Sequence, residues 1–419
     1  MRLKTIFNKC CKFKSFVITG ARFDEKRDSI ILSVQRRANA RPICSCCAKT
    51  APGYDTPKGC RLFEFIPFWG FQVYLEYAKS RVECPKCGVR VEKVPWADGN
   101  RHLTFQYVKY LADWAKVISW KGVADRFHTS WETVRKSVES IVKYGLKHRR
   151  VDNVEAVGID EVQYQKGHKY LTLVYQIDSG RRRLLWLGDK RTRKTLLRFF
   201  RDFEKLSPGF AGRIKVVCSD MWKAYLSVVA KKVPKATHIL DRFHIMQKFS
   251  KALDKVRASE AKRLKADGKE PVLVKSRWCF LKRKSNLTSG QSFKLNELLQ
   301  MNLRSVKAYL LKEQFQKFWE YSSPTWAGKY LDAWCKKTMY SKIEPMKDIA
   351  KMLRSHRELI LNYFRARKQY NSGIVEGLNL KVKLTVRKSF GFKSLKIIET
   401  ALYHQLGDLP EPEFAHDFW

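Results

Sequence analysis

The chain of 419 residues carries 84 Lys and Arg against 40 Asp and Glu, which gives a formal net charge of +44 spread along its whole length. This charge favours a polyanionic partner bound across an extended surface, and a hydrophobic content of 44% supports two to four folded domains and excludes a disordered chain. A membrane-surface protein is the rival hypothesis, but no segment approaches the roughly 18 apolar residues that a membrane-spanning helix needs.

The N-terminal residues 1–16 carry bases throughout and lack the apolar stretch of a signal peptide, which predicts a cytoplasmic protein. In that compartment the eleven cysteines are not expected to form disulfides. Clustered cysteines are then better explained as metal ligands or buried thiols.

Two C-x-x-C pairs are the first chemical signal along the chain. Their spacing lets two thiolates of each pair bind one tetrahedral Zn²⁺. Residues 60–69 and 71–78 between the pairs are predicted to form a hairpin around Gly70, so this region resembles a zinc ribbon. Cys46 is an alternative to Cys47 as a ligand, and a set of reduced core cysteines without a metal is the alternative to a zinc site. The predicted ligands of a structural zinc ion are Cys44, Cys47, Cys84 and Cys87.

Three helices are predicted next, the first over 103–118 and the second over 119–128. The third helix is expected to begin after Thr129, because Thr129 followed by Glu132 three residues later is the pattern of a capping box. This is the pattern of a helix-turn-helix, whose second helix places its first residues at base edges in the DNA major groove. Another small three-helix unit would show the same pattern. The outward side chains that would contact DNA are Trp131, Thr133, Arg135 and Lys136.

From residue 150 the periodicity changes to short apolar strands. Strands at 155–160, 169–177 and 183–187 predict an antiparallel meander. Helices and strands then alternate at 194–205, 214–218, 221–231, 237–240 and 243–256. This order is that of a ribonuclease-H-like α/β fold, with a mixed sheet of three antiparallel strands plus two further strands with helices.

Asp160 ends the first of these strands and Asp220 follows the fourth, and the two strands are neighbours in such a sheet. Carboxylates held close together are unfavourable unless a cation lies between them, and hard oxygen ligands suit Mg²⁺ or Mn²⁺. Two such ions activate the attacking oxygen and stabilise the leaving oxygen of a phosphoryl displacement. The pair therefore predicts a metal-dependent phosphodiester-cleaving site.

Glu376 is the candidate third ligand, because it is the only acid between Glu358 and Glu399 in a strongly basic segment. Glu399 and Asp241 are the alternatives. Residues 257–355 are predicted to be an all-helical insertion with basic surfaces that follow a DNA backbone. Core packing is the better interpretation for most of its tryptophans, which are Trp278, Trp319, Trp326 and Trp334.

The predicted domains are a zinc-ribbon-like module, a helix-turn-helix, the first part of the catalytic core, the helical insertion, and a closing helix with a C-terminal tail. Their boundaries are 1–98, 99–150, 151–256, 257–355 and 356–419, respectively.

Five motifs resemble those of insertion-sequence transposases of the ISL-three family, and the likeness covers nearly the whole chain. They are Gly158-Ile-Asp160-Glu161, Ser219-Asp220-Met-Trp-Lys-Ala-Tyr225, Asp241-Arg-Phe-His244, Asn371 to Asn379, and Arg387 to Phe392. The resemblance implies that Asp160, Asp220 and Glu376 form a DDE triad. It also places His244 near the active site, where a structural hydrogen bond is its alternative role. Asn371 and Asn379 are expected to fix the packing of the glutamate helix.

The resemblance further implies Mg²⁺- or Mn²⁺-dependent DNA cleavage and strand transfer. The expected partners are double-stranded terminal inverted repeats and target DNA, bound by a homo-oligomer at the bacterial nucleoid. A ribonuclease-H-like structure-selective nuclease and a non-catalytic DNA-binding regulator are the alternatives. The bases expected to hold DNA phosphates after the glutamate are Lys381, Lys383, Arg387 and Lys388.

Overall fold

Two units make up the fold in this computed structural model, one formed by residues up to 149 with those from 384 onward and the other by residues 150–383. The structure describes residues 3–55, 57, 59–165, 167, 169–370, 372–389, 392 and 394–413.

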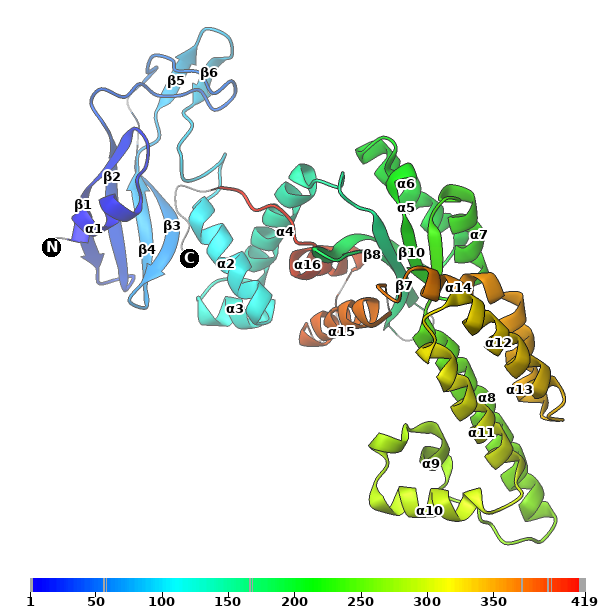
Figure 1. Cartoon of the computed structure of the whole chain (residues 1–419). Helices are drawn as coiled ribbons and strands as arrows, with labels where there is room; N and C mark the ends of the chain where they lie inside the picture. Colours follow the sequence, from blue (N-terminus) through cyan, green and yellow to red (C-terminus); the bar gives the residue numbers. More distant parts are fainter. Residues whose placement is uncertain are drawn as a thin grey trace. The chain divides into compact units, whose positions relative to one another are not determined.

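The first unit begins with helix α1 (Leu3–Cys10) and a four-stranded sheet in the order β1-β2-β4-β3 (Figure 1). The predicted hairpin is confirmed, with Gly70 in the left-handed region at a φ of 88° in the turn. Trp96 is fully buried and its ring meets Phe16 and Phe63. The strands are β1 (Phe16–Asp24), β2 (Ser29–Arg36), β3 (Arg61–Phe68) and β4 (Phe71–Tyr77).

Three helices follow, with N-caps at Thr104, Ser119 and Ser130. The prediction that Thr129 caps the third helix was wrong by one residue, because the Ser130 hydroxyl accepts the Thr133 N–H. Glu132 is then not at the third helical position, as a capping box requires. The helices are α2 (Phe105–Val117), α3 (Trp120–Arg126) and α4 (Trp131–His148).

Helix α16 (Leu395–Leu406) also belongs to this unit and packs on α4. The segment after it lies against Gly145, where an added Cβ would come within 2.5 Å of Leu409 Cβ and 2.9 Å of the Pro410 carbonyl oxygen. Glu411 then pairs with Lys116 at 2.6 Å. The three-helix unit is therefore completed by residues from the far end of the chain.

His404 on α16 is buried, and it is expected to make the stability of this unit depend on pH. Burial lowers the pKa of His404 to about 3, with the charge of Lys116 acting in the same direction. The unfolded chain protonates this side chain below about pH 6.5 while the folded chain does not, so stability is lost as the pH falls through that value. We expect the unit to unfold about 1 kcal/mol more easily at pH 5.5 than at pH 7.5.

Denaturant titration of the His404→Gln variant at both pH values checks this prediction, because the variant lacks the titrating ring and should lose about 1 kcal/mol of the pH dependence. The exposed His148 on α4 is the matched control, and His148→Gln should keep the full pH dependence. A His404→Gln variant with unchanged pH dependence would contradict the assignment.

The second unit is built on a five-stranded mixed sheet in the order β11-β10-β7-β8-β9, which confirms the ribonuclease-H-like prediction. Strands β7, β8 and β9 are antiparallel neighbours, whereas β10 and β11 run parallel to β7. The strands are β7 (Ala156–Gln165), β8 (Lys169–Asp178), β9 (Arg181–Asp189), β10 (Val216–Ser219) and β11 (Thr237–Leu240).

Three helices cover one face of this sheet, where Val157 and Ile159 of β7 join a core with Phe199, Phe203 and Tyr225. The opposite face carries α15 (Ser372–Lys388), because Val375 of this helix lies against Gly158 of β7. The three helices are α5 (Arg193–Leu206), α6 (Phe210–Arg213) and α7 (Lys223–Lys232).

The predicted all-helical insertion is confirmed, between β11 and α15. The 25-residue helix α8 (Arg242–Ala266) leaves the sheet, and α11 (Arg304–Gln316) runs beside it, with α9 and α10 at the far end of this pair (Figure 1). The remaining elements are α9 (Arg277–Leu281), η1 (Lys284–Asn286), α10 (Ser289–Leu299), η2 (Lys317–Glu320), α12 (Pro324–Met339), α13 (Glu344–Ser355) and α14 (Arg357–Arg365).

Core packing, which was expected for most of the four tryptophans of the insertion, is found for two of them. Trp319 and Trp334 are 4% exposed and pack in the core, whereas Trp278 and Trp326 are exposed. Within the described ranges, no helix is long and apolar enough to cross a membrane.

Candidate functional site

Asp160 lies on β7, and Asp220 directly follows the neighbouring parallel strand β10. Ser219 at the end of β10 pairs with Ile159 of β7, so the next residue of each strand is one of the two aspartates. Asp160 does not end its strand as predicted, because β7 continues to Gln165 along its pairing with β8. The side-by-side placement of the two strands is nevertheless the one that the element order predicted.

The Asp160 carboxylate is held by groups on two sides. Its Oδ2 accepts a hydrogen bond from Asn379 Nδ2 at 2.5 Å, and its Oδ1 accepts the Glu161 backbone N–H at 2.7 Å. The buried Tyr175 hydroxyl donates in turn to Asn379 Oδ1 at 2.7 Å. Burial raises the pKa of Asp160 above its usual value, although the Glu161 N–H and the charge of His244 oppose this rise. A nearby cation would offset the cost of ionising this buried carboxyl group.

Glu376 lies on α15, three residues before Asn379, and its side chain is exposed. Helical residues three apart share a face, so Glu376 and Asn379 point to the same side of α15. Among the described residues, Asp160, Asp220 and Glu376 do not form a group whose ligand atoms lie close enough together to hold one metal ion. The helix thus contacts Asp160 through Asn379, with the Glu376 carboxylate one turn away.

Gly158 sets how closely α15 approaches β7. A Cβ at this position would lie 2.6 Å from Val375 Cγ2, which is closer than carbon atoms tolerate, and 3.2 Å from Ile177 Cγ2, which is a tight contact. Val375 is buried and its β-branched side chain has few alternative rotamers. Any larger residue at 158 therefore pushes the glutamate helix away from the strand that carries Asp160.

We expect Gly158→Ala to cost about 1–3 kcal/mol of folding free energy, because overpacking forces off-rotamer side chains or backbone shifts. Chemical denaturation measures this loss. Gly180, where nothing lies within 4 Å of an added Cβ, provides the control, and Gly180→Ala should be close to neutral. Equal stabilities for the two variants would contradict the close approach.

His244 and Asp241 form a pair beside the two aspartates. Asp241 caps α8 by accepting the Phe243 N–H at 2.7 Å, and its Oδ2 lies 2.7 Å from His244 Nδ1. Burial alone would lower the pKa of His244, but the Asp241 hydrogen bond and the charges of Asp220, Asp241 and Asp160 raise it to about 9. His244 therefore has the predicted structural hydrogen bond, and its ring also carries positive charge near both acids.

Asp241 and Glu399, the alternative third acids, lie in different surroundings. Asp241 lines a small cavity together with Asp160 and Ser219, but its carboxylate already bonds Phe243 and His244. Glu399 is on α16 in the other unit. The predicted contribution of Asn371 lies outside the described residues.

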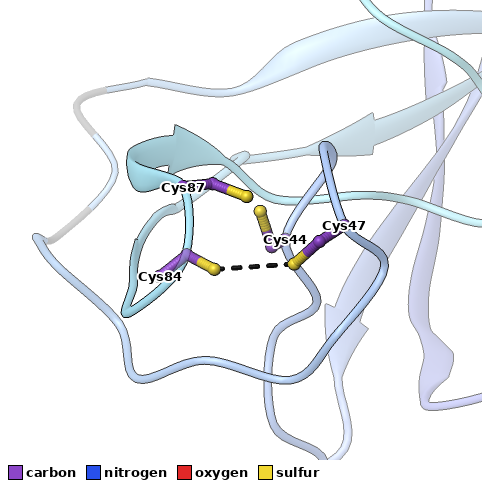
Figure 2. Close-up of side chains that lie close together, drawn as sticks. All are labelled: Cys44, Cys47, Cys84 and Cys87. Carbon is purple, nitrogen blue, oxygen red and sulfur yellow. Dashed lines mark hydrogen bonds between the residues drawn. The ribbon is translucent and has the colours of Figure 1, made fainter.

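The four predicted zinc ligands come together, with their Sγ atoms all within 4.8 Å of one another (Figure 2). The second pair is on the hairpin of β5 (Arg81–Cys84) and β6 (Gly88–Val91), in which Gly88 has a φ of 70°. Cys47 Sγ lies 3.5 Å from Cys84 Sγ, near the sulfur separation that tetrahedral Zn²⁺ imposes and far beyond a disulfide bond. This group contains Cys47 and not Cys46, which is exposed.

Backbone N–H groups favour the thiolate of Cys84, whereas burial raises the pKa of the Cys87 thiol. The pKa of Cys84 is lowered to about 7, chiefly by the backbone N–H of Lys86, and the Cys46 N–H donates to Cys44 Sγ at 3.4 Å. Thiolates are the form of cysteine that binds metals. The donor set and its geometry therefore fit a structural zinc ion.

The predicted DNA-contacting residues of α4 lie in its first two turns. Arg135 is bound by two acids of its own helix, Glu132 at 2.7 Å and Glu139 at 2.6 Å, whereas Lys136 is exposed. Trp131 meets the ring of Trp120 at 5.9 Å across α3 and α4, so it is not fully outward as predicted. Thr133 bonds the Ser130 cap.

The predicted phosphate-binding bases follow Glu376 along α15. Lys381, Lys383 and Arg387 are exposed. Lys388 instead donates to the carbonyl oxygens of Ala115 at 3.3 Å and Lys116 at 3.0 Å, which caps the C-terminal end of α2. Burial lowers its pKa below the usual value.

Comparisons with known proteins agree on one family. The model of the ISL3 DDE family, described as "Transposase", matches residues 157–402. The transposase for insertion sequence element IS1001 of Bordetella parapertussis is 30% identical over 331 residues, which cover 78% of this chain and 80% of that protein. The transposase for insertion sequence element IS1557 of Mycobacterium tuberculosis is 28% identical over 418 residues, which cover 93% and 91% of the two chains.

Among solved structures, the strand transfer complex of the Drosophila P element transposase matches with a TM-score of 0.38 and 9% sequence identity. The match covers 71% of this chain and 92% of the other chain. A similarity this low carries no argument, and the ribonuclease-H-like description rests on the strand order and directions given above.

Proposed function

We propose, since the chain belongs to the ISL3 family of DDE transposases, that it binds the terminal inverted repeats of an insertion sequence and catalyses metal-dependent DNA cleavage and strand transfer. The observation that carries the proposal is the placement of Asp160 and Asp220 at adjacent positions of parallel strands, with α15 bonded to Asp160 through Asn379. Asp160, Asp220 and Glu376 are the proposed catalytic residues.

The donor chemistry of the site fits Mg²⁺ or Mn²⁺, because three carboxylates supply hard oxygen ligands. When bound, such ions polarise the phosphodiester and lower the pKa of water, so that no nucleophilic side chain is needed. Asp160 is held in orientation by Asn379 and the Glu161 N–H, and Asp220 by the Met221 N–H at 2.5 Å. Glu376 is exposed on α15, and the proposed mechanism requires its carboxylate to turn toward the two aspartates.

The chain itself supplies the groups that bind DNA. The zinc module and the helices α3 and α4 are proposed to recognise the terminal repeats, with Lys136 and Thr133 at the start of the recognition helix. Lys383 and Arg387 on α15 are proposed to contact phosphates. Phosphate contacts supply affinity and register, whereas contacts of a few side chains with base edges supply specificity. Two repeats must be joined in one reaction, so a homo-oligomer is proposed to act.

A strand-transfer assay tests the proposal with the purified chain, a pre-cleaved duplex taken from the repeats that flank the gene, a plasmid target and Mg²⁺. Joined product is expected with Mg²⁺ or Mn²⁺ and none with EDTA. Nicking without joining would indicate a structure-selective nuclease instead. Binding without either reaction would indicate a DNA-binding regulator.

A further inference from the structure

Arg191, two residues after β9, is held against two aromatic rings on the surface of the second unit. Its guanidinium carbon lies 4.4 Å from the centroid of Tyr170 and 5.3 Å from that of Trp222. The side chain of Arg191 and the residue Trp222 are each 41% exposed. The rings thus fix the position of a cation that remains open to solvent. We call Tyr170, Arg191 and Trp222 the arginine–aromatic cluster.

The backbone before Arg191 is shaped to hold it there. Lys190 has a φ of 66°, which costs energy for a residue with a Cβ. Its N–H donates to the Tyr170 carbonyl oxygen at 2.8 Å, and its carbonyl oxygen accepts from Thr172 Oγ1 at 2.8 Å. Two hydrogen bonds to β8 therefore keep this strained residue in place.

The negative partner of Arg191 is Glu161, the residue after Asp160. Side chains alternate along a strand, so Glu161 lies on the face of β7 that α7 covers, opposite to Asp160. Glu161 Oε1 is 3.6 Å from Arg191 Nη1, beyond hydrogen-bonding distance, and Glu161 Oε2 is buried with no hydrogen-bond partner among the described residues. Elsewhere in this unit Arg357 instead bonds both oxygens of Asp332, at 3.1 and 3.0 Å. Glu161 therefore leaves most donors of Arg191 unused.

The cluster is at the same edge of the sheet as the proposed active site. Trp222 follows Asp220 by two residues, and Glu161 directly follows Asp160. A solvent-open guanidinium is a donor for a phosphate, and an exposed indole presents a face on which a base stacks. The strongly basic chain already favours a polyanion as its partner.

We propose that the arginine–aromatic cluster binds one nucleotide of the DNA strand next to the scissile phosphate, with Arg191 on its phosphate and Trp222 against its base. This inference rests on the proposed function, since the nucleotide belongs to the DNA that Asp160 and Asp220 would cut. Glu161 holds the guanidinium over the edge of the sheet without saturating it. The rival role of Arg191 is simple neutralisation of the Glu161 charge.

Phosphate contact is tested with the full chain and duplexes from the repeats flanking the gene, each carrying a single uncharged methylphosphonate near the cleavage position. Arg191→Met keeps the aliphatic stem and is expected to weaken binding of the unmodified duplex by about tenfold or more. In the wild type, one methylphosphonate position should cause a similar loss, and in Arg191→Met that position should cause no further loss. The matched control is Arg198→Met. Arg198 on α5 is also exposed, and it lies 5.2 Å from the ring of Trp186 on β9.

Base stacking is tested with 2-aminopurine at the same nucleotide, whose fluorescence is quenched when it stacks. Quenching should persist in Trp222→Phe and disappear in Trp222→Ala. Unchanged quenching in Trp222→Ala would overturn the stacking role of Trp222.

Two results overturn the phosphate contact. One is a loss of binding on methylphosphonate substitution that, at every position, is the same in Arg191→Met as in the wild type. The other is a double variant Arg191→Met/Glu161→Gln that restores wild-type binding, because simple neutralisation of Glu161 would then suffice. If the wild-type chain neither binds nor cuts the duplex, the proposed function itself is wrong, so the two failures are distinguishable.

Discussion

We expect Asp160→Asn and Glu376→Gln each to lower the rate of DNA strand cleavage by about a thousandfold or more, because the loss of one carboxylate ligand removes several kcal/mol of transition-state stabilisation. Both changes keep the size of the side chain and remove only its charge. Single-turnover cleavage of a repeat-end duplex in Mg²⁺ measures the rate, and a gel-shift titration shows whether DNA binding is retained.

Glu155→Gln is the matched control for these variants. Glu155 directly precedes β7 and forms an exposed ion pair with Lys215 at 2.7 Å, a type of interaction worth about 0–1 kcal/mol. The Glu155→Gln variant should therefore cleave DNA at nearly the wild-type rate. Cleavage by Asp160→Asn within tenfold of wild type would remove the catalytic assignment. Normal cleavage by Glu376→Gln together with an inactive Asp241→Asn or Glu399→Gln would move the third ligand to one of those acids.

Replacing Cys84 by serine is expected to abolish zinc binding and to unfold the module around the β5–β6 hairpin, because its buried core is small. That core is centred on Cys44, Ala51, Val82 and Cys84, and metal binding in modules of this kind supplies most of their folding free energy. Elemental analysis should find about one zinc ion per wild-type chain and none in the variant. Thermal unfolding should show an early transition that the wild type lacks, and a chelator should reproduce it.

Cys46 and Cys60 provide the controls for zinc binding. Both are exposed and neither belongs to the group of four sulfurs, so Cys46→Ser and Cys60→Ser should retain zinc, whereas Cys47→Ser should lose it. Zinc lost from Cys46→Ser and kept by Cys47→Ser would show that Cys46 is the ligand. Zinc kept by Cys84→Ser with unchanged stability would contradict a metal site.

The features that the sequence predicted correctly are those determined by interactions between residues close together in the chain. Short apolar runs bounded by turn residues predicted all five strands of the second unit, and the strand order of the ribonuclease-H-like fold then placed Asp160 beside Asp220. The C-x-x-C spacing predicted the cysteine group for a similar reason, since each pair occupies a single tight turn. The cap of α4 was misplaced because Thr129 and Ser130 are adjacent and both side chains can cap a helix.

Contacts across long stretches of chain were not predictable in this way. Asn379 meets Asp160 across 219 residues, and this contact depends on the rotation of α15 on the sheet. Arg191 was not singled out, because its ring partners come from β8 and from the residue before α7, and no local spacing links the three. The presence of α16 beside α4 also depends on packing alone.

The contact between α16 and α4 affects the order in which the two units can fold during synthesis. Helices α2, α3 and α4 emerge early from the ribosome, but the residues that pack against Gly145 and pair with Lys116 are translated only after the entire second unit. Domains generally fold as units in the order of synthesis. The second unit can therefore fold while the first still lacks a part of its core, so a nascent chain acquires its proposed nuclease centre before its proposed DNA reader is finished.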